Sequence, residues 1–194
     1  MLAEIIKKNR SYRRFFQEVG ITANDLLEMA DNARLSASAR NSQSLKYILS
    51  NDETTNAVIF PCLAWAGYLK DWSGPGTGER PSAYIVMLND REITQNYFCD
   101  HGIAAQSILL TAVEKGYGGC IIASVNHSKL REELTIPDRF DIIQVIALGK
   151  PKEEVIMDPI AADGDIRYWR DENQVHHVPK RSLEEVVLRK PLKS

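Results

Sequence analysis

The sequence predicts a mixed α/β fold in which helices cover both faces of one β-sheet. Stretches with helical periodicity alternate with short, continuous apolar runs, and the chain has no internal repeat or low-complexity segment. Its 194 residues, 44% hydrophobic and 26% charged, suit a globular chain with a sizeable core. We expect one domain spanning residues 1–194, with a C-terminal arm from about residue 165 to residue 194.

The N-terminal part has the apolar spacing of three helices, over residues 2–8, 22–34 and 56–69. Thr22 and Asp25 approximate a capping box at the start of the second helix. The third helix would direct four apolar side chains inward: Val58, Ile59, Leu63 and Ala66. A strand is expected at Tyr47, and the glycine-rich run 72–78 indicates a loop.

Three continuous apolar runs predict buried strands, over residues 82–88, 119–123 and 142–148. The helix expected at residues 101–115 is apolar on nearly all sides, and Gly116 ends it. A domain of this size can hardly cover such a helix by itself, so we expect part of it at a subunit interface. A short helix begins at Asn126 and runs through Leu134.

The last thirty residues predict a hairpin and a final helical turn. Residues 166–170 and 175–178 flank a turn-like segment, which is the pattern of two antiparallel strands. Ser182 and Glu185 have the spacing of a capping box before a helical turn at residues 183–188. These elements form the expected arm.

Composition excludes several classes of protein. The formal net charge of −2 argues against a nucleic-acid or membrane binder, and no apolar run reaches membrane-spanning length. The N-terminus lacks the pattern of a signal peptide. Cys62, Cys99 and Cys120 are widely spaced and form no metal or redox motif, so each is expected to be a small buried hydrophobe in a reducing cytoplasm.

No metal site is expected either. The chain has no CxxC or histidine–carboxylate ligand spacing. His176 and His177 are adjacent on an expected strand, so they would point to opposite faces and could not easily share a metal ion.

The strongest candidate binding string is residues 10–15, Arg-Ser-Tyr-Arg-Arg-Phe. Arg10 and Arg13 offer forked donors that suit a phosphate, and Ser11 adds a hydroxyl. A solvated basic turn is the alternative for this string by itself.

A second string, residues 38–43, joins an expected helix to an expected strand. The side-chain amides of Asn41 and Gln43 present donors and acceptors side by side, which suits a flat heterocycle with alternating carbonyl and NH groups. The alternative is an ordinary polar loop.

Near the C-terminus, Lys180 and Arg181 precede the start of the last expected helix, where the backbone also attracts anions. The alternative is a charged surface tail. A glycine-rich run at residues 115–120 follows a helix and precedes a strand, the reverse of a dinucleotide-binding fingerprint, so we exclude a Rossmann site. Gly118 and Gly119 could still let a ligand ring approach the backbone closely.

Taken in order, these strings resemble the nitroreductase family. Five segments carry the resemblance over nearly the whole chain: residues 9–15, 37–45, 100–120, 147–151 and 180–185. The chain departs from the family pattern at three positions: Ala37 and Ser44 replace the usual prolines, and Leu45 replaces an aromatic residue. The resemblance implies a mixed central sheet flanked by helices, in an intertwined homodimer with two FMN sites at the subunit interface.

The resemblance also implies which residues bind FMN. The phosphate would be held by three residues, with Lys180 and Arg181 assisting: Arg10, Ser11 and Arg13. Four residues would approach the flavin, part of them from the other subunit: Ser38, Arg40, Asn41 and Gln43. Gly118 and Gly119 would lie near the ring.

The implied activity is a ping-pong transfer of electrons from NADH or NADPH, through bound FMN, to a small electron-poor acceptor such as a nitroaromatic or a quinone. The flavin would carry the chemistry, so no catalytic residue is expected. A protein contact to flavin N5 from residues 119–124 would come from the backbone or from Ser124.

Two alternatives stay open at this point. The same fold could serve another redox reaction, either reductive dehalogenation or oxidation of an azole ring. The basic residues could instead form a non-enzymatic module that binds phosphate or polyanions, with a steep dependence on salt: Arg10, Arg13, Arg14, Lys180 and Arg181.

Overall fold

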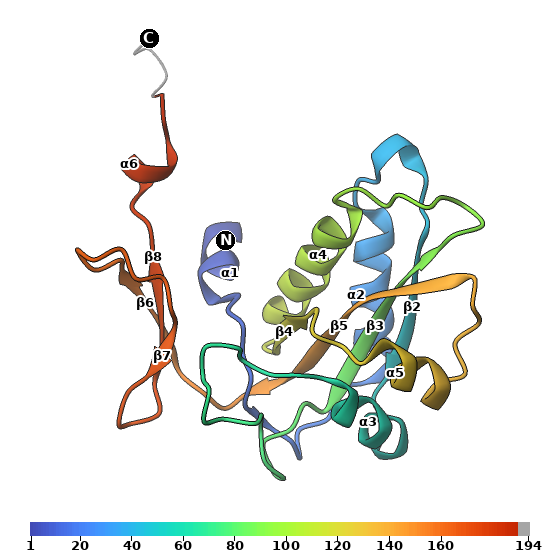
Figure 1. The fold of residues 1–194 in the computed structure, drawn as a ribbon, viewed down its shortest axis with the longest axis horizontal. Helices are drawn as coiled ribbons and strands as arrows, with labels where there is room; N and C mark the ends of the chain where they lie inside the picture. Colours follow the sequence, from blue (N-terminus) through green and yellow to red (C-terminus); the bar gives the residue numbers. More distant parts are fainter. Residues whose placement is uncertain (190–194) are drawn as a thin grey trace.

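The computed structural model describes residues 1–189, and its centre is a five-stranded antiparallel sheet (Figure 1). The strand order is β1-β5-β3-β2, and β4 also pairs with β5. The strands are β1 (Phe15–Phe16), β2 (Leu45–Ser50), β3 (Ala83–Asp90), β4 (Gly118–Ile122) and β5 (Phe140–Pro151). All three predicted buried strands are present, and Tyr47 lies in β2.

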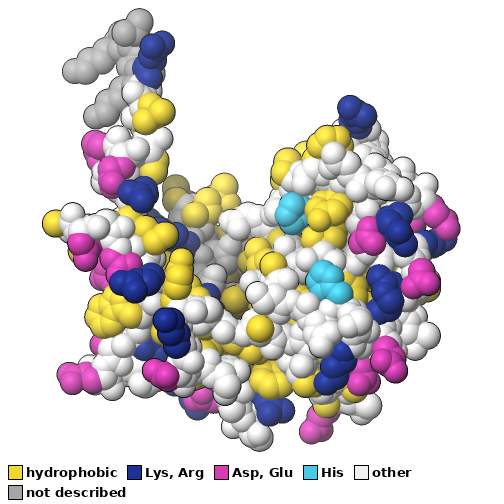
Figure 2. Space-filling view, in the orientation of Figure 1, with side chains coloured by type: hydrophobic (Ala, Val, Ile, Leu, Met, Phe, Trp, Pro, Cys, Tyr) yellow, Lys and Arg dark blue, Asp and Glu magenta, His cyan; other side chains and the backbone are white. Residues whose placement is uncertain are grey.

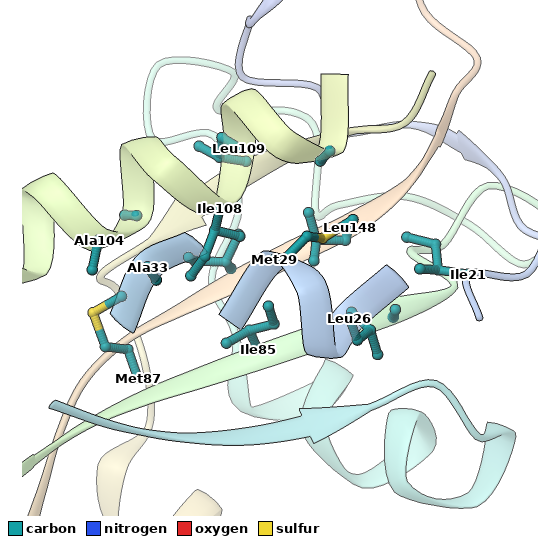
Figure 3. Close-up of a cluster of buried hydrophobic side chains, with 14 residues drawn as sticks. Ile21, Leu26, Met29, Ala33, Ile85, Met87, Ala104, Ile108, Leu109 and Leu148 are labelled. Carbon is teal, nitrogen blue, oxygen red and sulfur yellow. The ribbon is translucent and has the colours of Figure 1, made fainter. Parts of the chain in front are cut away.

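Helices cover both faces of this sheet, which confirms the predicted α/β class. The mixed central sheet implied by the resemblance is wrong for this chain, because every strand pairing in the main sheet is antiparallel. One face packs against α2 (Ala23–Leu35) and α4 (Asp100–Glu114), and the other against α3 (Glu53–Ile59) and α5 (His127–Glu133). Successive residues of β3 alternate between the two cores because side chains along a strand point to opposite faces. Ile85 joins the cluster drawn in Figure 3, whereas Val86 joins the cluster beneath α3 and α5.

The predicted helix boundaries at α2 and α4 are confirmed. The Thr22 hydroxyl accepts a hydrogen bond from the Asp25 amide at 3.1 Å, so Thr22 is the N-cap of α2. After α4 the chain turns at Gly116, whose φ of +80° is a conformation that residues with a Cβ rarely adopt.

Two predictions about the middle of the chain are wrong. The helix expected over 56–69 begins earlier and ends at Ile59, where a 3₁₀ turn, η2 (Phe60–Cys62), contains Pro61. Proline lacks the amide that would continue the α-helical pattern, and Leu63 is already extended. Cys99 is exposed rather than buried, because it lies just before α4; Cys62 and Cys120 are buried.

The residues after β5 form a second, three-stranded unit, called here the C-terminal sheet. It consists of β6 (Val155–Pro159), β7 (Trp169–Arg170) and β8 (His176–Lys180). The predicted hairpin is present, with Arg170 opposite His176, while β6, parallel to β8, was not predicted. Figure 1 shows this sheet beyond α1 (Leu2–Lys8), at the side of the main sheet.

After the C-terminal sheet, α6 (Leu183–Val186) starts with the predicted capping box between Ser182 and Glu185. The expected arm extends to residue 194, so its last five residues lie outside the described part of the chain. Figure 2 shows this end of the chain projecting from the body, with apolar side chains exposed along it. Within residues 1–189, no helix combines the length and the apolar character that crossing a membrane requires.

Candidate cofactor site

A basic hollow of about 240 Å³ lies between the N-terminal string and β8. Its lining includes four of the residues predicted to hold a phosphate: Arg10, Ser11, Arg13 and Lys180. Three cations thus face one small space with no carboxylate in the lining, and none of the three has an ion-pair partner within residues 1–189. Such a cluster repels itself unless an anion occupies the hollow.

The local structure directs Ser11 and Arg13 into this position. Ser11 forms a parallel bridge with Gly119, and the Tyr12 amide donates to the Gly119 carbonyl at 3.0 Å. The N-terminal string is therefore fixed along the edge of β4. The Arg13 side chain is 9% exposed, and its guanidinium lies 4.7 Å from the centre of the Tyr168 ring. Burial and contact with an aromatic ring hold this cation in one place.

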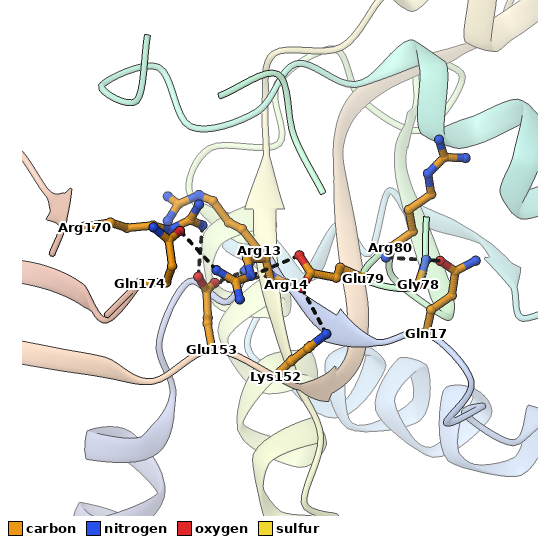
Figure 4. Close-up of polar contacts among 10 residues, drawn as sticks. All are labelled: Arg13, Arg14, Gln17, Gly78, Glu79, Arg80, Lys152, Glu153, Arg170 and Gln174. Carbon is orange, nitrogen blue, oxygen red and sulfur yellow. Dashed lines mark hydrogen bonds and ion pairs between the residues drawn. The ribbon is translucent and has the colours of Figure 1, made fainter. Parts of the chain in front are cut away.

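The other two basic residues of these strings have partners elsewhere. Arg14 pairs with Glu79 at 3.1 Å, outside the hollow (Figure 4). Arg181 pairs with Glu185 at 3.2 Å across one turn of α6 and is not part of the lining. Of the predicted phosphate residues, the structure therefore brings together all except Arg181.

Glu153 does not line the basic hollow, but it holds together the segments that do. Its side chain is fully buried and accepts hydrogen bonds from the backbone amides of Arg13 and Arg14. It also forms an ion pair with Arg170 at 3.0 Å (Figure 4). One buried carboxylate thus ties the N-terminal string to the C-terminal sheet, so both sides of the hollow depend on it.

A second hollow, of about 210 Å³, shares Arg13 and Tyr168 with the first. Its lining comes from the β4 end and from the loop at residues 64–67, and includes Trp65, Ile122 and Ser124. The loop is held there because the Ala64 amide donates to the Ser124 carbonyl at 2.9 Å. The two hollows adjoin at Arg13 and Tyr168 and are together called the groove here. Cations line one part of it, and backbone, apolar and hydroxyl groups line the other.

Gly118 and Gly119 have a structural role in this chain. A Cβ on Gly118 would lie 2.5 Å from the Tyr12 ring, and one on Gly119 would lie 2.6 Å from the Ala147 carbonyl oxygen. Glycine is therefore required by close packing within the chain. The lining of the second hollow instead comes from residues 120–124, which follow the two glycines.

The predicted loop at residues 38–43 is tightly shaped. Three of its non-glycine residues have left-handed backbone conformations, with φ between 51° and 54°: Arg40, Asn41 and Gln43. The buried Asp100 carboxylate holds the loop by accepting hydrogen bonds from the Ser38 hydroxyl at 2.7 Å and the Ala39 amide at 2.9 Å. Backbone strain that persists under such support is typical of functional loops.

The side chains of this loop are presented outward. Arg40, Asn41 and Gln43 are exposed, whereas Ser38 is used internally, since its hydroxyl also accepts from the Gln43 amide at 3.0 Å. Ser38 and Gln43 line a larger hollow of about 660 Å³, beside α2 and Tyr47. This hollow shares no residue with the basic one.

Within one chain, the 38–43 loop and the phosphate residues line different hollows. Asp100, which holds the loop, begins α4, and β4 follows its end (Figure 1). The N-terminal string contacts α4 between these points, since the Asn9 side chain donates to Oε1 of Gln106 at 3.4 Å. No residue of the loop lines the basic hollow.

Several site residues were not predicted from the sequence. Trp65, Ala66 and Gly67 were predicted to be helical. Tyr168, just before β7, and His176 in β8 belong to the C-terminal unit, and no local sequence pattern indicates that this unit contacts Arg13. The left-handed conformation of Ala66, with φ of +42°, shows how sharply the loop departs from a helix.

A mixed α/β body with a recessed cationic hollow is suited to an anionic ligand. Comparison with known proteins gives the family that the chain resembles. A model described as the nitroreductase family matches residues 68–150. YodC of Bacillus subtilis (strain 168), named as an NAD(P)H nitroreductase, is 21% identical over 177 residues, which cover 76% of this chain and 88% of its own.

Solved structures agree. A nitroreductase family protein from Clostridium novyi NT is 27% identical, with a TM-score of 0.65 over 78% of this chain and 87% of its own. An FMN-dependent nitroreductase from Clostridium difficile R20291 is 25% identical, with a TM-score of 0.64 over 77% of this chain and 87% of its own. The resemblance found in the sequence is confirmed, because the family model, the curated relative and the solved structures all support a nitroreductase-family protein.

Proposed function

We propose that the chain is an FMN-dependent oxidoreductase that accepts electrons from NADH or NADPH and passes them to a small electron-poor acceptor. The observation that carries this proposal is the groove in which three cations with no ion-pair partner among residues 1–189 meet the β4 edge. Bound FMN would supply the redox chemistry, alternating between reduction by the nicotinamide and oxidation by a nitroaromatic or quinone. NAD(P)H and FMN appear in the names of the relatives described above.

The residues present fit FMN by their chemistry. Arg10, Arg13 and Lys180 supply charge-assisted donors for a phosphate, and the basic hollow contains no carboxylate that would oppose it. Beyond Arg13 the groove continues along residues 120–124, where backbone groups and the Ser124 hydroxyl are available to the heteroatoms of a ring. Trp65 and Tyr168 would shelter that ring from water.

We further propose that the site is completed by a second copy of the chain. The Ser38–Gln43 loop lines a hollow that shares no residue with the basic one, so within one chain the two parts of the predicted site do not meet. The chain also exposes 11544 Å² of surface, whereas a compact monomer of this size would expose roughly 9300 Å². Exposed apolar residues on α1 and at the C-terminal end would be covered in a dimer: Leu2, Ile6, Leu183, Val186 and Leu188.

The direct test is a pair of titrations, with FMN and with riboflavin, which lacks the phosphate. Arg13→Ala should lower FMN affinity by about one to two decades, because a hydrogen bond to a charged group contributes roughly 1.5–3 kcal/mol. Riboflavin affinity should hardly change. Arg14→Ala is the matched control, since Arg14 pairs with Glu79 outside the hollow. Absence of flavin absorbance after incubation with excess FMN would refute the proposed function.

Mixed dimers test the composite site. One chain carries Arg13→Ala and the other Gln43→Ala, a change that should weaken FMN and riboflavin alike in the homodimer. If each site takes its phosphate residues from one copy and its loop from the other, one site of the mixed dimer receives both defects and the other receives none. Half of the sites should then bind FMN as the unaltered protein does. Two equally weakened sites, or a monomer by light scattering with FMN bound, would contradict the composite site.

A further inference from the structure

His176 contacts the side of Arg13 that faces the C-terminal sheet. It is the first residue of β8, is 1% exposed, and its Nε2 lies 3.1 Å from Nη1 of Arg13. The His176 ring also packs against Tyr168, with 5.2 Å between ring centres, and the Arg13 guanidinium lies over the same Tyr168 ring. The three side chains therefore form one packed unit beside the basic hollow.

The protonation of this histidine follows from its partner. A guanidinium has donors only, so Nε2 of His176 must accept the hydrogen bond, and the ring proton must be on Nδ1. Burial, assisted by the charges of Arg13 and Arg170, lowers the pKa of His176 to about 4. The imidazole is therefore neutral at neutral pH and able to accept.

The same contact determines which edge of Arg13 is available. Nη1 donates to the Ser11 carbonyl at 3.2 Å and to His176, so both of its hydrogens are used. Nε and Nη2 have no oxygen or nitrogen acceptor among residues 1–189, although the Cys120 thiol lies close to the Arg13 side chain. Arg13 lines both hollows of the groove. The Nε–Nη2 edge is one of those through which arginine binds a phosphate with two parallel hydrogen bonds.

We propose that His176 is a positioning residue for the anion site: it holds Nη1 of Arg13 so that the Nε–Nη2 edge is presented to the phosphate. The inference rests on the proposed binding of FMN. An arginine that is already fixed loses less conformational freedom when the anion binds, so affinity rises without a direct contact between His176 and the ligand.

Packing alone would not favour histidine at this position. Nδ1 of His176 is buried and has no hydrogen-bond partner within residues 1–189. An unsatisfied buried donor is destabilising, and a phenylalanine would fill a similar space without one. What histidine adds is the acceptor at Nε2, and Arg13 is the group that uses it.

The test compares His176→Phe, which keeps a planar ring but loses the acceptor, with His176→Gln, which keeps an acceptor. His177→Phe is the matched neighbour, because His177 instead contacts Asp158 at 2.8 Å and stacks on Trp169. FMN and riboflavin are titrated against each. His176→Phe should weaken FMN about five- to tenfold, the contribution of one hydrogen bond, with riboflavin unchanged. His176→Gln should stay within about twofold of the unaltered protein, as one retained acceptor implies.

A double-mutant cycle shows whether the effect acts through Arg13. In an Arg13→Ala background, adding His176→Phe should change the FMN-to-riboflavin ratio no further. An equal loss for both flavins, an unchanged ratio in the single variant, or a full effect without Arg13 would each overturn the inference. If the unaltered protein binds neither flavin, or binds riboflavin and FMN equally, the proposed phosphate site itself is refuted. If only the His176 inference is wrong, the unaltered protein still prefers FMN over riboflavin, so the two failures can be distinguished.

A second measurement needs no variant. Nitrogen chemical shifts of His176 in the intact protein at neutral pH should show the proton on Nδ1 and an unprotonated Nε2. A proton on Nε2 would overturn the inference even if the Phe variant failed to fold.

Discussion

The main sheet and the C-terminal sheet are held by different interactions. The two apolar cores contain residues from Ile21 to Leu148 and none from the C-terminal sheet. That sheet is instead attached by polar contacts, Glu153 with Arg170 and His176 with Arg13. The contacts of His177 with Asp158 and with the Trp169 ring lie within the C-terminal sheet itself. The contacts that attach it are also those that shape the basic hollow.

The difference implies that cofactor binding and docking of the C-terminal sheet are coupled. A ligand that bridges Arg13 and Lys180 would bind both units at once. Binding of such a ligand stabilises the arrangement that it recognises. The following predictions test whether the two regions respond separately when each is perturbed.

The largest effect is expected at Glu153, which is fully buried. Glu153→Ala leaves Arg170 and two backbone amides without their acceptor. Removing one partner of a buried ion pair costs about 3–5 kcal/mol of stability. Hydrogen exchange in β7 and β8 should accelerate strongly while β3 remains protected. Glu154→Ala, at an exposed neighbour, is the control. Equal loss of protection in β3 would show that the two sheets unfold as one unit.

A substitution in the core of the main sheet should lower global stability and leave the cofactor site unaffected. Ile146 is completely buried in β5, and Ile146→Ala should lower the free energy of unfolding by about 2–5 kcal/mol through lost burial and a cavity. Urea denaturation followed by circular dichroism measures this. The FMN-to-riboflavin affinity ratio should not change, because no residue of the basic hollow lies in the core. A changed ratio would mean that the core shapes the hollow directly.

The pH dependence of the C-terminal sheet should come from His176. Its pKa is about 4 in the folded protein, against about 6.5 when unfolded, so the unfolded chain binds the extra proton between these values. Stability is fully present above pH 6.5 and falls as pH decreases to 4, by up to about 3 kcal/mol. Denaturation midpoints at pH 7 and pH 5 should differ less in His176→Phe than in the unaltered protein. An equal difference between the two midpoints in both proteins would refute the assignment of the pH dependence to His176.

The smallest effects are expected at two helix caps. Thr22→Ala removes the cap of α2 in the body and should lower global stability by about 1 kcal/mol. Ser182→Ala removes an equivalent cap at α6, beyond the C-terminal sheet, and should leave the global unfolding midpoint unchanged. Thermal denaturation of both variants compares them directly. A similar loss at Ser182 would show that α6 contributes to the cooperative unit.

Local signals in the sequence predicted most of the body correctly. The alternation of apolar residues, the caps at Thr22 and Asn126 and the glycine at position 116 all act within a few residues, so they can be recognised without the fold. The prediction failed at residues 60–69, where apolar spacing suggested a helix. There a local 3₁₀ turn ends the helix, and two hydrogen bonds to distant residues then decide the path. The Ala64 amide donates to the Ser124 carbonyl, and the Cys62 carbonyl accepts from the Asn126 amide.

The sequence by itself determined the α/β class, the principal helices and strands, the resemblance to the nitroreductase family, and the basic and amide-bearing strings of the candidate site. The tertiary structure alone decided which of these residues meet. It placed Lys180 beside Arg10 and Arg13, paired Arg14 with Glu79, and brought His176 into contact with Arg13. The physical reason is that local periodicity fixes elements, whereas ion pairs and hydrogen bonds between distant segments depend on how those elements pack.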